Sequence, residues 1–254
     1  MIHIVGAGPG AVDLITVRGQ KLLSEADVVI YAGSLVSRDL LGWARQDARI
    51  YDSASMDLEQ VMEVMEQAEW DGLTTVRLHT GDPCLYGAIR EQMDRLEEMG
   101  IAYDVCPGVS SFNGAAASLG AELTLPEVSQ TVIITRMAGR TAVPERESFR
   151  SLAAHHSTMA VFLSAGLLEE MEEELKEAGY RPDTPAAIVY KATWPEEKAV
   201  RCTVSTLKET AEREGIRKTA MILIGNVLGT REENGYADSR LYAPDFTTGF
   251  RKGT

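Results

Sequence analysis

A run of small and polar residues that follows an apolar stretch is the part of this sequence best suited to bind a small molecule. The run is His79-Thr80-Gly81-Asp82-Pro83-Cys84-Leu85-Tyr86-Gly87, and it follows the strand-like Thr74-Thr75-Val76-Arg77-Leu78. In open α/β sheets, ligands bind in the crevice outside the carboxyl ends of the strands. The order of these residues therefore predicts a ligand-binding turn, followed by a helix over 88–99.

A second turn of the same kind follows the strand-like segment 102–105. It reads Cys106-Pro107-Gly108-Val109-Ser110-Ser111, and an alanine-rich helical segment comes after it. Serine is a preferred residue at helix N-termini, because its hydroxyl accepts a hydrogen bond from a backbone N–H of the first turn. Two such turns at strand ends indicate one shared cleft for a cofactor.

A third glycine-rich turn, Gly6-Ala7-Gly8-Pro9-Gly10, follows the short strand-like segment 2–5. A dinucleotide fingerprint requires a helix that begins at the loop, with its N–H groups directed at a pyrophosphate. Pro9 has no N–H, the next helical pattern begins only near Thr16, and the second strand-like segment, 27–31, does not end in an acid. We therefore disfavour a nicotinamide cofactor. A structural turn and a ligand-facing loop of another kind both remain open.

The cysteine and histidine residues do not predict a metal site. Cys84, Cys106 and Cys202 are far apart and form no Cys-x-x-Cys pair, so neither zinc ligands nor a disulfide framework is indicated. His155 and His156 are neighbours whose side chains point apart on a helix. Cys84 has no basic neighbour, so we interpret it as lining the turn rather than as a nucleophile. For His79, a structural role is favoured over a ligand-binding one.

The formal net charge of −13 disfavours nucleic acid as a partner, because nucleic-acid binding depends on clustered lysine and arginine. A few basic residues could still hold a carboxylated small molecule. These candidates are Arg136, Arg140 and Lys191, with Arg217-Lys218 further along the chain. The alternative for each of them is ordinary solvated surface charge.

The 254 residues suit two moderate domains, and 44% hydrophobic with 25% charged residues is an ordinary globular composition. No apolar run approaches the ~20 residues of a membrane helix. Met1 leads directly into an apolar strand without a basic leader segment. We expect a cytoplasmic protein that does not bind membranes.

The hydrophobic periodicity predicts an α/β protein with two domains and a tail, at 1–120, 121–230 and 231–254. In the first domain, strands alternate with helices such as the one that contains Leu58, Met62 and Met65, which predicts a mainly parallel sheet. In the second, strands at 186–190 and 199–204 are joined by a segment too short for a crossover helix. They should form an antiparallel hairpin, so the sheet should be mixed. The glutamates of 169–174 are the solvated face of an amphipathic helix.

Together, the three turns resemble those of a known family. Gly6-Ala7-Gly8-Pro9-Gly10 with Asp13-Leu14-Ile15-Thr16, then Gly81-Asp82-Pro83, then Pro107-Gly108-Val109-Ser110-Ser111 occur in the order found in the tetrapyrrole (corrin and porphyrin) methyltransferases, which use S-adenosylmethionine. Each motif alone is modest, but three in this order and spacing are specific. The resemblance extends over nearly the whole chain.

Further segments are similar to the branch of that family that methylates carbon 11 of the corrin precursor precorrin-4 in cobalamin biosynthesis. They are Tyr31-Ala32-Gly33-Ser34-Leu35-Val36, Glu127-Val128-Ser129-Gln130-Thr131, Ile134-Thr135-Arg136-Met137-Ala138-Gly139-Arg140, Val189-Tyr190-Lys191-Ala192-Thr193-Trp194-Pro195, Gly215-Ile216-Arg217-Lys218-Thr219-Ala220, and the tail Ser239-Arg240-Leu241-Tyr242. The second and fourth of these resemble the enzymes that act on the cobalt-bearing precursor more than those that act on the metal-free one.

The resemblance implies a homodimeric two-domain enzyme that binds its methyl donor between the domains. The donor contacts that it implies are Pro9, Gly81, Asp82, Leu85, Tyr86, Ser110, Ser111, Phe162, Leu163, Ala192, Thr219, Ala220 and Met221. It also implies that the loop with Gly8 and Gly10 faces the tetrapyrrole, for whose carboxylates we select Arg136, Arg140 and Lys191. Methyl transfer from sulfur to carbon is an in-line displacement that depends on positioning and needs no metal. No catalytic base is identified from the sequence.

Two other classes of function remain as alternatives. Relatives of this fold methylate the diphthamide precursor on a protein or methylate ribosomal RNA; the net charge disfavours RNA, and the segments above disfavour both. A noncatalytic binding module is the weakest alternative, because all the turns implied to hold the donor are present.

Overall fold

The computed structural model describes residues 1–253, the side chain of Asn234 excepted, and the chain divides into two compact units. The first unit comprises residues 1–115 together with the short segment 191–197. The second comprises 116–190 and the chain from 198 onward. Position in the sequence predicts that segment 191–197 belongs to the second domain, whereas the structure places it in the first unit.

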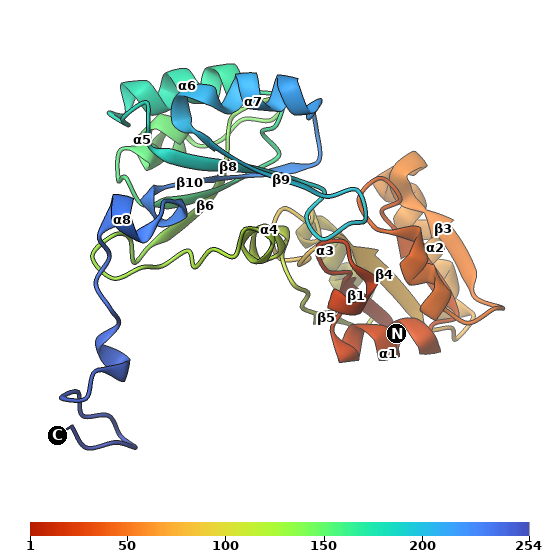
Figure 1. The fold of residues 1–254 in the computed structure, drawn as a ribbon. Coiled ribbons are helices and arrows are strands. Elements are labelled where there is room, and N and C mark those ends of the chain that lie inside the picture. Colours follow the sequence, from red (N-terminus) through yellow and green to blue (C-terminus); the bar gives the residue numbers. More distant parts are fainter. Residues whose placement is uncertain (254) are drawn as a thin grey trace. The chain divides into compact units, whose positions relative to one another are not determined.

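The first unit contains a five-stranded parallel sheet with the order β3-β2-β4-β1-β5, which confirms the predicted mainly parallel sheet (Figure 1). Its strands are β1 (Ile2–Gly6), β2 (Val28–Tyr31), β3 (Arg49–Asp52), β4 (Thr75–His79) and β5 (Tyr103–Cys106). Its helices are α1 (Val17–Glu25), α2 (Leu58–Trp70) and α3 (Arg90–Glu98), and α4 (Ser111–Leu119) runs on into the second unit. The central position of β4 places the turn after it at the middle of the carboxyl edge.

Helix α2 shows how the sequence fixes these elements. Asp57 accepts a hydrogen bond from the backbone N–H of Gln60, whose side chain reciprocates, so a capping box begins the helix. Residues three and four apart then form one apolar face, and Met62 and Met65 are buried in the same cluster as Ile2. These methionines are therefore core residues.

The second unit contains a five-stranded mixed sheet with the order β6-β7-β10-β8-β9. Its strands are β6 (Val132–Arg136), β7 (Thr158–Phe162), β8 (Pro185–Tyr190), β9 (Lys198–Thr203) and β10 (Ala220–Ile224). Only β6 and β7 pair in parallel; the other pairs, including the predicted β8–β9 hairpin, are antiparallel. The mixed sheet and the hairpin are thereby confirmed.

Three helices, α5 (Phe149–Ala153), α6 (Leu168–Glu177) and α7 (Leu207–Glu214), lie on one face of this sheet (Figure 1). Leu168, Met171 and Leu175 of α6 are buried, and the neighbouring glutamates face outward, as expected. Two of the glutamates also cap other helices: Glu174 accepts from the N–H of Arg150 at 3.0 Å, and Glu172 accepts from that of Lys208 at 2.8 Å. A carboxylate at a helix N-terminus is stabilising because it pairs with otherwise unsatisfied N–H groups.

One helix begins later than expected, and the tail contains a helix of its own. The helix predicted over 88–99 begins at Arg90, because Ala88 has φ +49° and cannot lie in a right-handed helix. The tail contains a short helix, α8 (Arg231–Asn234), whose N-cap residue Thr230 forms a capping box with Glu233. No helix within residues 1–253 is both long and apolar enough to cross a membrane.

Candidate functional site

The glycine-rich turns at 6–10 and 79–87 are hydrogen-bonded to each other in the first unit. Gly8 and Gly81 form a two-way bridge, with N···O distances of 3.2 Å and 2.8 Å, and the N–H of Ala7 donates to the carbonyl of His79 at 2.7 Å. The two turns follow β1 and β4, which are neighbours in the parallel sheet. Parallel strands bring their carboxyl ends to one edge, which is where the sequence predicted a site.

Asp82 fastens the third turn to these two. One oxygen of its carboxylate accepts from the N–H of Cys84 at 2.8 Å, and the other accepts from the N–H of Gly108 at 2.9 Å. A Cβ at Gly108 would lie 2.1 Å from the carbonyl oxygen of Gly81, so only glycine permits this approach. The structure thus gives Asp82 a positioning role, and a direct contact of Asp82 with the methyl donor stays a prediction.

The backbone around Gly81 is held in unusual conformations. Gly81 has φ +60°, and Tyr86 and Ala88 also lie in the left-handed region, with φ +56° and +49°. Residues other than glycine seldom adopt this region, and where they do the strain is concentrated at binding or catalytic sites. The side chain of Tyr86 is 44% exposed. The turn is therefore a rigid backbone platform with an exposed aromatic ring at its rim.

Segment 191–197 packs on the first of these turns. The indole N–H of Trp194 donates to the carbonyl of Pro9 at 3.0 Å, and the hydroxyl of Thr193 accepts from the N–H of Ala11 at 2.9 Å. A Cβ at Gly10 would fall 2.0 Å from the Trp194 ring, so the indole occupies the space that Gly10 leaves open. These contacts bring Ala192, which is buried, into the same unit as Pro9. Trp194 and its partner Pro9 are 185 residues apart, so no local pattern of residues indicates this role.

Lys191 lies at the base of this segment. Its Nζ is 3.5 Å from a carboxylate oxygen of Glu196 and 4.9 Å from the centre of the Trp194 ring. Lys191 and Thr193 both have positive φ, +46° and +67°. The segment thus has the same kind of strained backbone as the turn after β4.

The predicted residues of the second unit gather at one end of its sheet. Arg136 ends β6 opposite Phe162, which ends β7. Because β10 runs antiparallel to β7, its first residues, Ala220 and Met221, lie at this end too. Leu163 and Thr219 beside them have φ +54° and +55°. All the predicted donor-binding residues of this unit therefore lie together.

Two arginines selected for the substrate differ in their surroundings. The Arg136 guanidinium donates to the carbonyls of Met137, Thr141 and Ala142, at 3.2, 3.1 and 2.7 Å. It therefore shapes the loop after β6. Arg140 lies within that loop and is exposed. Their contact with a substrate stays a prediction.

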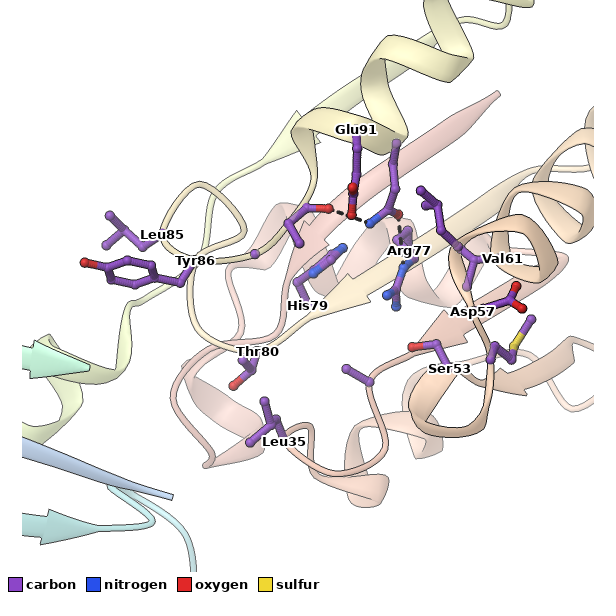
Figure 2. Close-up of a pocket in the computed structure, with 16 residues that line it drawn as sticks. Leu35, Ser53, Asp57, Val61, Arg77, His79, Thr80, Leu85, Tyr86 and Glu91 are labelled. Carbon is purple, nitrogen blue, oxygen red and sulfur yellow. Dashed lines mark hydrogen bonds between the residues drawn. The ribbon is translucent and has the colours of Figure 1, made fainter. Parts of the chain in front are cut away.

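A cavity of about 290 Å³ lies beside the turn after β4, wholly within the first unit (Figure 2). Arg77, His79 and Gln92 line it as buried side chains, and the exposed Asp57, Tyr86 and Glu91 line its rim. Burial lowers the pKa of Arg77 to about 10. Burial, followed by the charge of Arg77, lowers the pKa of His79 to about 3. The sequence singled out His79 but not Arg77, whose only signal is a charge between Val76 and Leu78 in a buried strand.

Two of the cysteine thiols, those of Cys84 and Cys202, have raised pKa values that disfavour a reactive thiolate. Burial and the neighbouring Asp82 raise the pKa of the Cys84 thiol, which disfavours a thiolate there. Burial raises the pKa of Cys202 to about 11. Within residues 1–253, no three His, Cys, Asp or Glu side chains are grouped so that they could hold a metal ion.

Comparison with known proteins gives consistent similarities along the chain. Residues 1–208 match the family described as Tetrapyrrole (Corrin/Porphyrin) Methylases. The chain is 53% identical over 251 residues to the cobalt-precorrin-4 C(11)-methyltransferase of Methanocaldococcus jannaschii, covering 99% of this chain and 96% of that protein.

Two solved structures are similar as well. The X-ray structure of the cobalamin biosynthetic enzyme cobalt precorrin-4 methyltransferase, CbiF, superimposes with a TM-score of 0.88 at 50% identity, covering 90% of this chain and 96% of that one. Uroporphyrin-III C-methyl transferase from Thermus thermophilus, complexed with S-adenosyl homocysteine, gives a TM-score of 0.75 at 26% identity, with 90% and 93% of the two chains covered.

Proposed function

Because the chain belongs to the tetrapyrrole (corrin/porphyrin) methylases, we propose that it transfers a methyl group from S-adenosylmethionine to carbon 11 of cobalt-precorrin-4 in cobalamin biosynthesis. The observation that carries this proposal is the 53% identity over almost the full length of both chains. The three bonded turns add support, because they form a preorganised backbone site where the parallel sheet of the first unit ends.

The turns fit a methyl donor by their chemistry. Gly81 has no side chain, so a ligand can approach its backbone closely. A Cβ built at this position would have the nitrogen of Ser111, at 3.4 Å, as its nearest neighbour. Backbone N–H and C=O groups at such a turn can hold the polar parts of a nucleoside or amino acid, and Leu85 and Tyr86 supply apolar surface beside them. We assign donor contacts to Pro9, Gly81, Leu85 and Tyr86 in this unit.

The other donor contacts that we propose come from four short stretches of the chain. Ser110 and Ser111 lie at the start of α4, and Ala192 lies beside the Pro9 loop. The remainder are Phe162, Leu163, Thr219, Ala220 and Met221, which share one end of the second sheet.

When bound, S-adenosylmethionine supplies a methyl group that its positively charged sulfur makes electrophilic. The residues of this chain contribute by holding the acceptor carbon in line with that methyl group and by excluding water. Correct orientation of two reactants lowers a barrier by up to roughly 7–11 kcal/mol. The rigid turns fixed by Asp82 and Trp194 are suited to that task.

The experiment that tests this function supplies S-adenosylmethionine labelled in its methyl group to the purified protein. Cobalt-precorrin-4, ribosomal RNA and elongation factor carrying the diphthamide precursor are offered separately. We expect label only in the tetrapyrrole, at carbon 11. Transfer to RNA or to protein alone would replace the proposal with one of the other activities of this fold.

We assign Lys191, Arg136 and Arg140 to the carboxylates of the tetrapyrrole, and Gly8 and Gly10 to its face. An ammonium or guanidinium group holds a carboxylate by charge. Lys191→Ala should weaken tetrapyrrole binding far more than binding of S-adenosylhomocysteine, when both are measured by calorimetry. Equal losses for the two ligands would mean that Lys191 shapes the site in general.

We also propose that the enzyme acts as a homodimer in the cytoplasm, as the family resemblance implies. Sedimentation equilibrium of the purified protein should return twice the mass of one chain. A monomer at the concentrations at which the protein turns over would contradict the dimer.

A further inference from the structure

Strand β4 carries a polar stripe on one of its faces. Successive side chains of a strand point to opposite faces, so Thr75, Arg77 and His79 share one face while Val76 and Leu78 share the other. The second face packs in an apolar cluster, as expected for a central strand. The first face holds three polar groups in a buried position, and its last two members line the cavity of about 290 Å³ (Figure 2).

Arg77 is buried without a balancing charge. Its side chain is 7% exposed, and its hydrogen bonds go to the amide oxygen of Gln92 and to the carbonyl of Ile30, both at 3.3 Å. Gln92 is held in turn, because its amide nitrogen donates to the carbonyl of Ala88 at 3.0 Å. Among residues 1–253, no carboxylate approaches the guanidinium within salt-bridge distance. A buried cation that is held only by neutral partners is unfavourable unless an anion joins it.

His79 has an unused polar atom in the same place. The side chain is 6% exposed, and its Nε2 has no hydrogen-bond partner among the described residues. Buried polar atoms are nearly always paired, and the two unpaired ones among the described residues, His79 Nε2 and Thr75 Oγ1, lie on this one face of β4. Only His79 of these two lines the cavity, so it is the one that a ligand in the cavity could pair with. Arg77 and His79 project from β4 toward the same space (Figure 2).

The other ionisable groups of the cavity belong to its rim. Asp57 and Glu91 are exposed, and the Asp57 carboxylate already accepts the N–H of Gln60 at the start of α2. Tyr86 is also at the rim and exposed. Solvated carboxylates interact weakly at a distance, because water screens their charge. Among the residues that line the cavity, Arg77 and His79 are therefore the only ionisable side chains that are buried.

We propose that this cavity binds one carboxylate side arm of the tetrapyrrole, with the Arg77 guanidinium as its charge partner and the His79 imidazole as a hydrogen-bond donor. This inference rests on the proposed function, and it adds a subsite distinct from Lys191, Arg136 and Arg140. The volume corresponds to about ten waters at roughly 30 Å³ each, which leaves room for a carboxylate arm. When the arm enters, the carboxylate supplies the negative charge that favours a proton on His79.

The test compares four variants in the full-length protein. Arg77→Met and His79→Leu remove the two contacts, His79→Gln keeps a hydrogen-bond donor, and Thr75→Val is the matched control on the same buried face but outside the cavity. Affinity for cobalt-precorrin-4 is measured by absorbance titration, and affinity for S-adenosylhomocysteine by calorimetry. A hydrogen bond to a charged group corresponds to about a tenfold to hundredfold change in affinity.

We expect Arg77→Met and His79→Leu each to weaken tetrapyrrole binding by about tenfold to hundredfold. His79→Gln should lose less affinity than His79→Leu, and Thr75→Val should bind the tetrapyrrole as the wild type does. S-adenosylhomocysteine should bind alike in all of them. If Arg77→Met does not fold, the two His79 variants carry the test. Nitrogen NMR of labelled histidine gives a second readout, in which the Nε2 signal of wild-type His79 shifts when the tetrapyrrole is added, as expected for a new hydrogen bond.

Unchanged tetrapyrrole affinity in the folded Arg77→Met and His79→Leu variants would overturn the subsite, as would a His79 Nε2 signal that is the same with and without the tetrapyrrole. These results leave the proposed function intact if the wild-type protein methylates carbon 11. Conversely, a wild-type protein that binds the tetrapyrrole through Arg77 and His79 but transfers no methyl group to it would overturn the function and keep the subsite.

Discussion

At the scale of single residues, Gly81 is set apart by a backbone conformation combined with a close neighbour. It has φ +60°, and any side chain there would point toward Ser110 and Ser111. Gly72 has a similar φ of +69°, but a Cβ at that position would meet nothing within 4 Å. The two glycines therefore separate the cost of the backbone conformation from the cost of filling the site.

We expect Gly81→Leu to abolish binding of S-adenosylhomocysteine and Gly72→Leu to leave it unchanged. Both variants should lose about 1–2 kcal/mol of stability, because a left-handed conformation is unfavourable for a residue with a Cβ. Calorimetry gives the affinities, and thermal unfolding verifies that both proteins fold. Retained affinity in a folded Gly81→Leu protein would remove Gly81 from the donor site.

His79 should make the stability of the protein depend on pH in the acid range. Its pKa lies near 3 in the folded protein, compared with 6.5 for an ordinary histidine, so the unfolded chain binds the extra proton between these values. Stability is therefore unaffected above pH 6.5 and is lost as the pH falls below it. Each pH unit in this window corresponds to about 1.4 kcal/mol.

Denaturant unfolding of wild type and His79→Gln at pH 6.5 and 4.5 measures this effect. The wild-type free energy of unfolding should fall by roughly 2–3 kcal/mol more than that of the variant. Parallel changes in the two proteins would show that His79 is already protonated, or solvated, in the folded state.

Cys84 is a residue whose substitution should have little effect on activity. Cys84 lies at the surface, yet partial desolvation of its thiol and the charge of Asp82 raise the pKa of that thiol, so it is a poor nucleophile. We expect Cys84→Ser to keep most of the methyl-transfer rate, and treatment of the protein with a chelator before substrate is added to change little. A folded but inactive Cys84→Ser protein would contradict this assignment.

At the scale of elements, the loop between β8 and β9 stabilises the glycine-rich turn that follows β1. The Thr193 hydroxyl accepts a hydrogen bond from the N–H of Ala11, and the Trp194 indole donates one to the carbonyl of Pro9. The loop thereby fixes the position of the glycine-rich turn at 6–10. Thr193 does so at φ +67°, a strained conformation for a β-branched residue. The strain is sustained by the contacts that the loop makes.

We expect Thr193→Val to expose the Ala11 amide and to speed its hydrogen exchange about fivefold, which corresponds to one hydrogen bond of ~1 kcal/mol. The Gly19 amide, which donates to Thr16 Oγ1 at 3.0 Å in the same unit, is the internal control. Equal exchange of the Ala11 amide in both proteins would show that the contact with Thr193 does not protect the turn.

The elements also show what local sequence can and cannot predict. The alternation of strands with helices gave the parallel sheet, and the short link at 191–197 gave the antiparallel hairpin. The helical spacing of Ile89, Met93 and Leu96 predicts a helix from residue 88, but Ala88 has a left-handed backbone and the helix begins only at Arg90. Arg77 and Trp194 could not be assigned from local patterns, because their partners lie far away in sequence, at Ile30, Gln92 and Pro9.

At the scale of the whole molecule, the net charge of −13 opposes a substrate that carries several carboxylates. As the substrate approaches from a distance, its carboxylates are repelled by the net charge of the protein. The local attraction of Arg77 and Lys191 acts only at shorter range. The Debye length falls from about 30 Å at 0.01 M salt to about 8 Å at 0.15 M, so added salt removes the repulsion at long range. The net charge should thus slow the encounter at low salt.

We expect the association rate of the tetrapyrrole to rise several-fold, on the order of 2–10, across this range of ionic strength. Stopped-flow absorbance measures the rate, and S-adenosylmethionine, whose charge is small, serves as the comparison ligand. A tetrapyrrole rate that falls with salt would show that the local cations dominate the encounter.

The assignment of residues 191–197 to the first unit has a consequence for attempts to dissect or recombine this chain. A fragment that ends at residue 115 lacks the indole that fills the space over Gly10, so it would expose an uncovered groove. Grafting residues 1–115 from a relative would fit only if the host hairpin carried a matching tip. The first unit is therefore discontinuous in sequence. It consists of residues 1–115 and the seven residues 191–197, and both parts must be transferred together.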